Sequence, residues 1–443
     1  MSSLKFLIKS FIPAKIWNGF AKSKGFIIHF PTKAYEFYLI NSAPLRHQKA
    51  LKKVRKKARI KVVFFLIHDS IWKYEEVYKL MEKDDRFEVI ILVCPYIIYG
   101  EQNMIVQMDS SFDNFKKRGY NVIKALNEFN GEWLDVKDSI KPDIIFFTNP
   151  HKLTLNNYYI SNFTNYLTCY APYNFGNSHL FHEMHNQIFH NCLWKLFAET
   201  DYHKELSSTY AENKGVNVVT TGFPGTDIFL DKKYEAKDVW KIKDKNIKRI
   251  IWAPHHTIDD NTDFLSYSAF LIYEKFMKNL LNEYKGSLQI AFKPHPLLKN
   301  KLFEHKDWGK EKTESYYDFW MTSENGQLNE GDYIDLFFTS DAMIHDSGSF
   351  LTEYLYLNKP VLHTNRDERI KERMNLFGIQ SFDMHYHAKN QNDIINFVDK
   401  LLAGLDEKKV ERELFFEENL MPPKKLTASE NIYNEIVSNI FQK

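Results

Sequence analysis

Short runs of β-branched and aromatic residues alternate with helical patterns along most of this chain, and this alternation limits the fold more than any other feature. The clearest run, residues 60–67, joins Ile, Val, Phe and Leu residues with a single lysine and no turn residue. Such runs are typical of parallel strands covered by helices on both faces. Comparable runs follow at residues 87–93, 142–147, 167–170 and 216–220. The first half of the chain is therefore expected to form a doubly wound parallel sheet.

A charged stretch at residues 231–248 interrupts this pattern, and a second set of strand–helix units follows it. Its predicted strands are residues 248–254, 288–292, 342–345 and 360–363. In open sheets of this kind, ligands lie at the carboxyl ends of the strands. We therefore predict an α/β protein with two Rossmann-like doubly wound domains that face a cleft, which is the glycosyltransferase-B (GT-B) arrangement.

These patterns also give the domain boundaries. We expect a basic amphipathic arm at residues 1–58, an N-terminal Rossmann-like acceptor domain at 59–230, a C-terminal Rossmann-like nucleotide-donor domain at 231–425 and a C-terminal helix at 426–443. Among the smaller elements, the pattern predicts helices at residues 72–82, 264–283 and 349–357, and a polar helix around 121–130.

Composition excludes several other classes of protein. With 44% hydrophobic and 26% charged residues, the 443-residue chain is globular rather than fibrous or disordered. Its three cysteines are far apart and form no Cys-X-X-Cys motif, which argues against a disulfide framework or a zinc ribbon and fits a reducing compartment. No run of 18 apolar residues is present, so we expect no membrane-spanning helix. We also expect no cleavable signal peptide, because lysines interrupt the N-terminal apolar stretches.

The N-terminal arm concentrates positive charge. Residues 1–60 contain fourteen Lys and Arg but one acidic residue, Glu36. Apolar positions 4, 7, 8, 11 and 12 recur at the helical period, and residues 52–59 hold six cationic side chains. A basic amphipathic helix of this kind suits an anionic membrane surface, and an ordinary helix packed on its domain is the alternative. No nucleic-acid partner is expected, because the arm matches no known module and the rest of the chain is acidic.

Polar residues follow three predicted strands of the second domain. The strand at 250–253 is followed by His255, His256 and Thr257, and the strand at 288–292 by Lys293-Pro294-His295-Pro296. The strand at 342–345 leads into Asp346-Ser347-Gly348-Ser349 at the start of a helix. If these loops meet at one sheet edge, their imidazoles, hydroxyls and free backbone N–H groups would bind a diphosphate. The sequence thus predicts an anion-binding pocket between two facing lobes.

Roles can be assigned to single residues of this pocket. His295 is predicted to stabilise charge on the phosphates during catalysis. Glu353 lies one helical turn after Ser349 and would accept hydrogen bonds from a ribose. The alternatives are structural: Ser349 as a helix cap, Glu353 as a first-turn acid and His295 as part of a rigid turn. The predicted donor-binding residues are His255, His256, Thr257, Lys293, Asp346, Ser347, Gly348, Ser349 and Glu353.

These motifs resemble the donor-binding half of the CDP-glycerol glycerophosphotransferases, which make or cap teichoic-acid-like and capsular polymers. The resemblance rests on His295-Pro296, Ser340-Asp341, Asp346-Ser347-Gly348-Ser349, Glu353 and Asn358-Lys359-Pro360, in the family's order, within roughly residues 190–365. The family's Trp-His-Gly-Thr-Pro loop is absent, and residues 170–179 stand in its place. The second domain also resembles UDP-N-acetylglucosamine 2-epimerase and other GT-B members. The resemblance implies a nucleotide-diphosphate donor.

Histidines of the first domain supply candidates for the acceptor side. His179, His182 and His185 are spaced so that one helix could present all three to a zinc ion. The spacing lacks the His pair at i and i+4 with an intervening glutamate, so we predict no metal site. His179 is instead a candidate acceptor base, as is the pair formed by His68 and Asp69 after the first strand. Packing histidines and a helix-capping loop are the structural alternatives.

Together these observations predict a transferase that moves glycerol phosphate or ribitol phosphate from a CDP-activated donor to a hydroxyl of a lipid-linked or polysaccharide acceptor. A GT-B glycosyltransferase with a nucleotide-sugar donor, a 2-epimerase, and a non-catalytic scaffold with a relic nucleotide site are the alternatives. We expect no cofactor and no metal, and we expect a cytoplasmic protein held at the inner face of the membrane by its basic arm. The nucleobase, the acceptor and the oligomeric state are left open.

Overall fold

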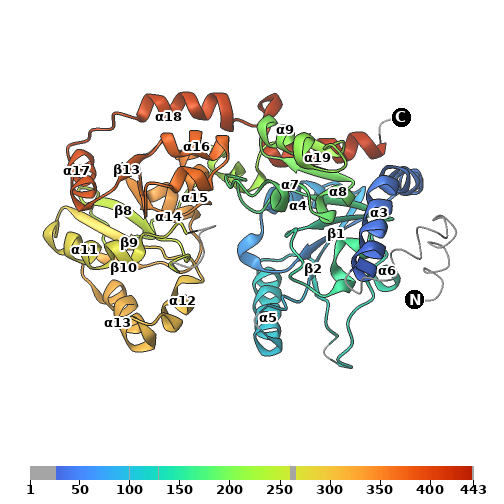
Figure 1. Ribbon diagram of the computed structural model, residues 1–443, viewed down its shortest axis with the longest axis horizontal. Helices are drawn as coiled ribbons and strands as arrows, with labels where there is room; N and C mark the ends of the chain where they lie inside the picture. Colours follow the sequence, from blue (N-terminus) through green and yellow to red (C-terminus); the bar gives the residue numbers. More distant parts are fainter. Residues whose placement is uncertain (1–25, 99, 128, 260–265, 442–443) are drawn as a thin grey trace.

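The computed structural model describes residues 26–98, 100–127, 129–259 and 266–441, and the side chains from residue 33 onward. The chain forms two lobes, each built on a parallel sheet with helices on both sides (Figure 1). The seven-stranded sheet of the first lobe has the order β3-β2-β1-β4-β5-β6-β7, and the six-stranded sheet of the second has the order β10-β9-β8-β11-β12-β13. The predicted α/β class with two Rossmann-like domains is therefore confirmed.

The first sheet is built from the apolar runs of the first half of the chain. Its strands are β1 (Ile60–Leu66), β2 (Phe87–Val93), β3 (Val122–Lys124), β4 (Ile144–Phe147), β5 (Leu167–Tyr170), β6 (Lys195–Ala198) and β7 (Val218–Thr220). Nearly every residue of β1, β2, β4 and β5 is buried, which is why these strands carry no polar alternation. Its helices are α3 (Phe26–Val54), α4 (Glu75–Glu82), α5 (Glu101–Lys117), α6 (Val136–Ser139), α7 (Phe181–His185), α8 (Ile188–Cys192), α9 (Asp201–Tyr210) and α10 (Asp227–Leu230).

The second sheet follows the charged stretch and has the same construction. Its strands are β8 (Lys248–Ala253), β9 (Leu288–Phe292), β10 (Gly326–Leu328), β11 (Ala342–His345), β12 (Val361–Thr364) and β13 (Tyr386–Ala388). Its helices are α11 (Phe270–Glu283), α12 (Leu298–Glu304), α13 (Gly309–Thr322), α14 (Ile334–Thr339), α15 (Phe350–Glu353), α16 (Leu376–Asp383), α17 (Gln391–Leu402) and α18 (Lys409–Phe415). The predicted helix at 349–357 consists of α15 and a 3-10 turn, Tyr354–Leu357.

The polar helix expected around residues 121–130 is wrong. Val122 and Ile123 instead extend the sheet as β3, where they pair with Ile91 and Leu92 of β2. The chain then turns back, and Leu126 pairs with Trp133 in an antiparallel bridge. This segment forms a strand because it pairs with a neighbouring strand, and local periodicity does not indicate such pairing.

Both ends of the described chain pack on the first lobe. Leu39, Ile40, Ala50 and Val54 of α3 belong to the core of that lobe, so this part of the expected basic arm is an integral helix. The amphipathic segment at residues 4–20 lies outside the described residues.

After α18 the chain crosses back to the first lobe, where the C-terminal helix α19 (Ala428–Phe441) lies (Figure 1). Ile432, Ile436 and Ile440 enter the first core, and the carboxylate of Asp227 accepts hydrogen bonds of 2.8 Å from the backbone N–H groups of Ala428 and Ser429. Among the described residues, no helix is both long and apolar enough to cross a membrane.

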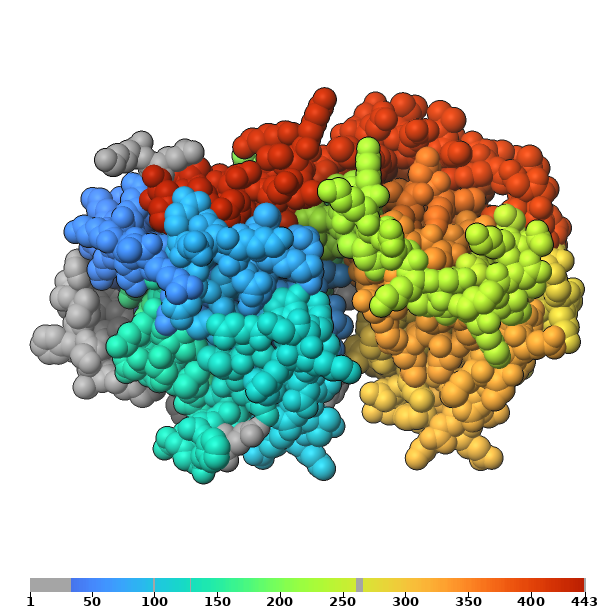
Figure 2. All heavy atoms as spheres, turned by 180° about the vertical axis from the view of Figure 1, so that it is seen from behind, coloured from blue at the N-terminus to red at the C-terminus, as the bar shows by residue number. Residues whose placement is uncertain are grey.

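An apolar cluster joins the lobes. Phe175 of the first lobe stacks on Phe377 of the second, with ring centroids 6.0 Å apart, and also packs on Phe223. Away from this contact the lobes separate, and Figure 2 shows a groove between residues near 100–150 and residues near 270–330. The carboxyl ends of β1 and of β8 and β9 lead into the loops that carry most of the predicted site residues.

Candidate functional site

Three loops of the second lobe meet at the carboxyl ends of neighbouring strands β9, β8 and β11. The backbone N–H of His295 donates to the carbonyl of Pro254 over 3.0 Å, and the N–H of His255 donates to the Asp346 carboxylate over 2.5 Å. The ring centroid of His295 lies 5.1 Å from that of His255 and 4.2 Å from that of His256. The predicted convergence of these loops is confirmed, while the roles of their residues stay predictions.

The imidazoles of this cluster are uncharged at neutral pH. Burial lowers the pKa of His256 to about 4 and that of His295 to about 3, and it lowers the pKa of His255 well below its usual value. The proximity of the rings adds to this effect for His255 and His295, because each disfavours a positive charge on its neighbour.

Backbone contacts determine which ring nitrogen carries the proton. Nδ1 of His295 accepts a hydrogen bond of 3.1 Å from the N–H of Leu297, and Nδ1 of His255 accepts one of 3.4 Å from the N–H of Thr257. A neutral imidazole that accepts at Nδ1 carries its hydrogen on Nε2. Both rings therefore offer an Nε2–H donor, which is the group that a phosphate oxygen needs.

The same cluster is the group of described residues that could hold a metal ion. His255, His256 and His295 each offer one ring nitrogen, and these atoms lie within 4.8 Å of one another. A metal needs a free lone pair on each ligating nitrogen, whereas two of the three rings use Nδ1 as an acceptor and carry a hydrogen on Nε2. No carboxylate joins the group. With a hydrogen on Nε2 of two of its rings, this histidine cluster suits a bound anion better than a metal cation.

Lys293 supplies the positive charge of the site. Its side chain is 6% exposed, and it forms no hydrogen bond or ion pair with any residue that the structure describes. Burial lowers the pKa of its ammonium group, although Asp332 and Glu330 act in the opposite direction. The ammonium nitrogen is not among the fully buried polar atoms that lack a partner, so it can meet a ligand, and an anion would supply the pairing that it lacks.

The third loop, residues 346–349, contains one residue that holds the neighbouring loops together and a glycine that lies beside open space. The buried carboxylate of Asp346 accepts from the N–H groups of His255 and Ala269, so it holds the loops together, and burial raises its pKa to about 7. A Cβ at Gly348 would meet no atom within 4 Å, which leaves open space beside the backbone. The hydroxyl of Ser349 makes no capping hydrogen bond at α15, contrary to the cap alternative.

Glu353 lies at the junction of the lobes. It is 1% exposed, and its Oε2 accepts a hydrogen bond of 2.6 Å from the hydroxyl of Tyr333. That hydroxyl in turn accepts one of 2.9 Å from Nζ of Lys73 in the first lobe. One carboxylate oxygen is thus engaged in an interlobe chain, and the ribose contact stays a prediction.

The first-lobe candidates lie at two places. His179 is at the lobe junction, where its backbone N–H donates to the carbonyl of Arg373. His68 follows β1, with Nδ1 3.2 Å from Asp69 and 2.8 Å from the hydroxyl of Ser70, and it lowers the pKa of Asp69 by hydrogen bonding. Both residues of the pair are about one-third exposed, so an acceptor can reach them.

The helix that would present three histidines to a zinc ion does not form. Helix α7 begins at Phe181 and therefore excludes His179, while His182 is exposed and His185 is buried against Ser207. The three histidines therefore do not share one helix face, and the expectation of no metal stays a prediction.

Asn177 is a functional candidate that sequence reasoning missed. Its side chain is 6% exposed and donates a hydrogen bond of 3.0 Å to the carbonyl of Gly348, and it accepts one of 3.1 Å from Thr352. Its backbone carbonyl accepts from Asn375 of the second lobe over 2.9 Å. The first lobe thus holds the loop predicted to bind the diphosphate, and nothing in the sequence near Asn177 indicates this contact.

Comparison with solved structures supports the fold. A variant of the wall teichoic acid polymerase TagF superposes with a TM-score of 0.55 at 14% sequence identity, covering 94% of this chain and 98% of that one. The MnaA–UDP complex of Staphylococcus aureus superposes with a TM-score of 0.54 at 17% identity, covering 87% of this chain and 98% of that one. These likenesses establish the GT-B type of fold.

Sequence comparison identifies the family. The chain is 28% identical to the teichoic acid ribitol-phosphate polymerase TarK of Staphylococcus aureus, in an alignment that covers 46% of this chain and 41% of TarK. It is also 28% identical to a teichoic acid poly(ribitol-phosphate) polymerase of Bacillus spizizenii, in an alignment that covers 43% of this chain and 30% of that protein. The chain thus spans less than half the length of these curated relatives. The family model for CDP-Glycerol:Poly(glycerophosphate) glycerophosphotransferase matches residues 194–438, so the chain belongs to that family.

Proposed function

We propose that this protein transfers a polyol phosphate, glycerol phosphate or ribitol phosphate, from a CDP-activated donor to a hydroxyl of a lipid-linked or polysaccharide acceptor. The observation that carries the proposal is the largely buried Lys293, which lies close enough to His295 to lower the pKa of that ring, while His295 lies against His255. One cation and two neutral N–H donors on neighbouring loops are the groups that hold a diphosphate. Family membership supports the chemistry, and the relatives' names support a ribitol- or glycerol-phosphate donor.

The geometry supports an in-line displacement. The acceptor hydroxyl attacks the β-phosphorus, a new P–O bond forms, and the bond to the leaving CMP breaks. Lys293 and the Nε2–H groups of His255 and His295 stabilise the charge that gathers on the phosphate oxygens. The acceptor's proton passes to a first-lobe base, either His179 or the pair of His68 and Asp69.

The proposed place of action is the cytoplasmic face of the membrane. Helix α3 supports this, because Tyr35, Phe37, Tyr38 and Leu45 are 48–65% exposed on it. The same helix ends in Lys52 and Lys53. An exposed aromatic and basic surface suits the headgroup region of an anionic membrane, where a lipid-linked acceptor would be held.

A panel of activated donors tests the proposed function. The full-length protein is incubated with CDP-glycerol, CDP-ribitol and UDP-N-acetylglucosamine, with and without a teichoic-acid-like acceptor, and CMP or UDP release is measured. We expect CMP release from a CDP-polyol that depends on the acceptor, and its loss in His295→Ala. His305→Ala, a partly exposed histidine outside the cluster, is the matched control.

Other outcomes identify the alternatives. Conversion of UDP-N-acetylglucosamine without an acceptor would indicate an epimerase, and sugar transfer would indicate a glycosyltransferase. Absence of nucleotide binding by calorimetry, or full turnover in His295→Ala, would contradict the proposal and favour a scaffold.

A further inference from the structure

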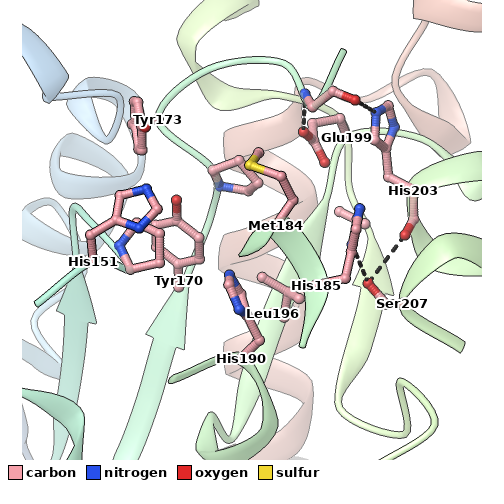
Figure 3. A pocket seen from close by; sticks show the side chains of 14 residues that line it. His151, Tyr170, Tyr173, Met184, His185, His190, Leu196, Glu199, His203 and Ser207 are labelled. Atoms are coloured by element: carbon pink, nitrogen blue, oxygen red, sulfur yellow. Dashed lines mark hydrogen bonds between the residues drawn. The ribbon is translucent and has the colours of Figure 1, made fainter. Parts of the chain in front are cut away.

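The first lobe contains a cavity that the proposed reaction has not yet used. It lies at the carboxyl ends of β4, β5 and β6, the edge where ligands bind in doubly wound sheets (Figure 3). Its lining includes His151, Tyr170, His185, His190, Glu199 and His203. These residues come from six segments between 151 and 203, so the chain folds several polar side chains around one hollow of about 20 Å³, which is room for a single water-sized group.

Two of the lining residues hold one side of the cavity in place through hydrogen bonds to a backbone loop. Oε1 of Glu199 accepts a hydrogen bond of 3.0 Å from the N–H of Gly176, and Nε2 of His203 lies 3.2 Å from the Gly176 carbonyl. The other ring nitrogen of His203 lies 2.8 Å from the hydroxyl of Thr200. Both nitrogens of His203 are therefore engaged, and the ring positions the loop around Gly176.

The remaining histidines present different groups to the cavity. The Ser207 hydroxyl donates to the carbonyl of His203, so its oxygen accepts from Nδ1–H of His185 over 3.0 Å, and Nε2 of His185 keeps its lone pair. Nδ1 of His190 accepts from the backbone N–H of Gln187, and Nδ1 of His151 accepts from the Gln187 side chain, both over 3.3 Å. His190 and His151 consequently carry their hydrogen on Nε2.

These three Nε2 atoms form no hydrogen bond within the part of the chain that the structure describes. The cavity therefore offers one acceptor and two donors. A single hydroxyl group donates one hydrogen bond and can accept two, so one hydroxyl of a ligand that enters the cavity matches this set.

The charge of the cavity also selects the ligand. Burial keeps the histidines neutral, lowering the pKa of His185 and of His190 to about 3, and no Lys or Arg is among the described residues that line the cavity. The one charged side chain in the lining is the acidic Glu199. A phosphate would therefore find no cation here, whereas a neutral polyol would meet no repulsion.

The cavity adjoins the donor loop through one residue. Gly176 lines the cavity, and the next residue, Asn177, donates to the carbonyl of Gly348 over 3.0 Å. A ligand in the cavity would thus lie on the first-lobe side of the loop that is predicted to hold the diphosphate.

We propose that this cavity binds the neutral polyol end of the acceptor, with His151, His185 and His190 as its hydroxyl-recognising residues. The inference rests on the proposed function for the identity of the ligand, because a polyol-phosphate chain ends in hydroxyl groups. It adds a subsite to the first lobe that selects uncharged, hydroxyl-rich ends and positions them beside the donor loop.

Polyol binding can be measured without any transfer reaction. Saturation-transfer NMR with glycerol and with ribitol is recorded on the full-length protein and on His190→Phe, which removes a donor at similar volume. Met184→Trp is a second variant that fills the cavity from a partly exposed position and spares the buried core. His182→Phe, on the same helix α7 but exposed and outside the lining, is the matched control.

We expect wild type and His182→Phe to bind a polyol, and His190→Phe and Met184→Trp to bind it about tenfold more weakly or worse, because a buried unmade hydrogen bond is costly. In transfer assays the acceptor KM should rise by a similar factor while donor affinity, measured by calorimetry with the CDP-polyol, stays within about twofold. If His190→Phe fails to fold by thermal unfolding, Met184→Trp decides the test.

Failure of this inference differs from failure of the proposed function. Transfer activity combined with unchanged polyol binding in folded His190→Phe and Met184→Trp would overturn the cavity proposal alone, as would a wild type that binds no polyol. Loss of polyol binding in those variants, in a protein that releases no CMP from any CDP-polyol, would retain the cavity and overturn the donor assignment.

Discussion

The two lobes share one architecture, and each gathers neutral histidines at the carboxyl edge of its sheet, yet they suit opposite ligands. In the second lobe, Lys293 lies close enough to His295 to lower the pKa of its ring, and His295 lies against His255, so the imidazoles act beside a cation. In the first lobe, His185 and His190 lie near the acidic Glu199, with no Lys or Arg among the described lining residues. The proposed phosphate site therefore differs from the proposed hydroxyl site by the sign of its neighbouring charge.

This difference teaches that counting histidines does not identify a ligand. Burial keeps both sets of imidazoles neutral, so neither set attracts an anion by itself. What distinguishes the sites is the neighbouring charge and the nitrogen that carries the hydrogen. On these grounds we propose negative charge as the ligand of the second lobe and neutral hydroxyls as the ligand of the first.

Removing the cation should produce the largest effect. Lys293→Met keeps the length of the side chain but removes the charge that faces the phosphates, and CMP release should fall by about 10²–10³-fold. Donor affinity should weaken as well, while polyol binding in the first lobe should not change. The measurement is CMP release at saturating acceptor together with calorimetry of the CDP-polyol, with His305→Ala as the control. Undiminished turnover in Lys293→Met would remove the distinction between the two lobes.

The acceptor base should give the next largest effect. Either His179→Gln or His68→Gln is expected to lower kcat by about 10²-fold, because a positioned base contributes at least that much. The variant that removes the base should also abolish the acidic limb of the kcat/KM–pH profile, which a merely structural loss would not do. Asp69→Asn should reproduce part of the effect if His68 is the base, since Asp69 lies 3.2 Å from its Nδ1. Full turnover in both histidine variants would place the base elsewhere.

The sequence predicted that the second-lobe loops converge but not that the first lobe holds a cavity, and the reason is physical. His255, His295 and Ser347 each follow a strand directly, so strand order alone brings them to one sheet edge. The cavity of the first lobe instead takes His151 from the loop after β4 and His185 and His190 from two five-residue helices. Such short helices leave no periodic signal, and their histidines meet only after the lobe has folded.

Contacts between segments that are far apart in the sequence could also not be predicted from local patterns. The segment that forms β3 was predicted to be helical because its local sequence does not show its pairing with β2, which lies about 30 residues earlier in the chain. The return of α19 to the first core depends on Asp227, some 200 residues before it. Asn177 lies in the loop where this sequence departs from the family motif, so the resemblance did not predict its hydrogen bond to the carbonyl of Gly348.

The junction between the lobes offers a smaller, structural test. A Cβ at Gly378 would lie 2.4 Å from the carbonyl oxygen of Asn177, and that atom is backbone and cannot rotate away. Gly378→Ala should therefore destabilise the protein by about 1–3 kcal/mol and loosen the contact that holds Gly348. Thermal unfolding measures the loss, and Gly331→Ala, where no atom lies within 4 Å of the added Cβ, is the control. Equal stability of the two variants would show that the lobes adjust freely at this contact.

Proton uptake should give the smallest effect and the finest distinction between the lobes. Burial holds the pKa of His256 at about 4 and that of His295 at about 3, so both are neutral in the free protein, and a bound diphosphate would raise these values. Donor affinity should therefore increase as the pH falls from about 6 towards 4, the free pKa of His256, by a few-fold and by no more than tenfold per unit for each proton taken up.

A neutral polyol gives the first-lobe histidines no such reason to take up a proton, so its affinity should not depend on pH over this range. Calorimetry in buffers of different ionisation enthalpy measures both cases. Proton uptake with the polyol but not with the donor would reverse the assignment of the two sites, because proton uptake identifies the lobe that binds the anion.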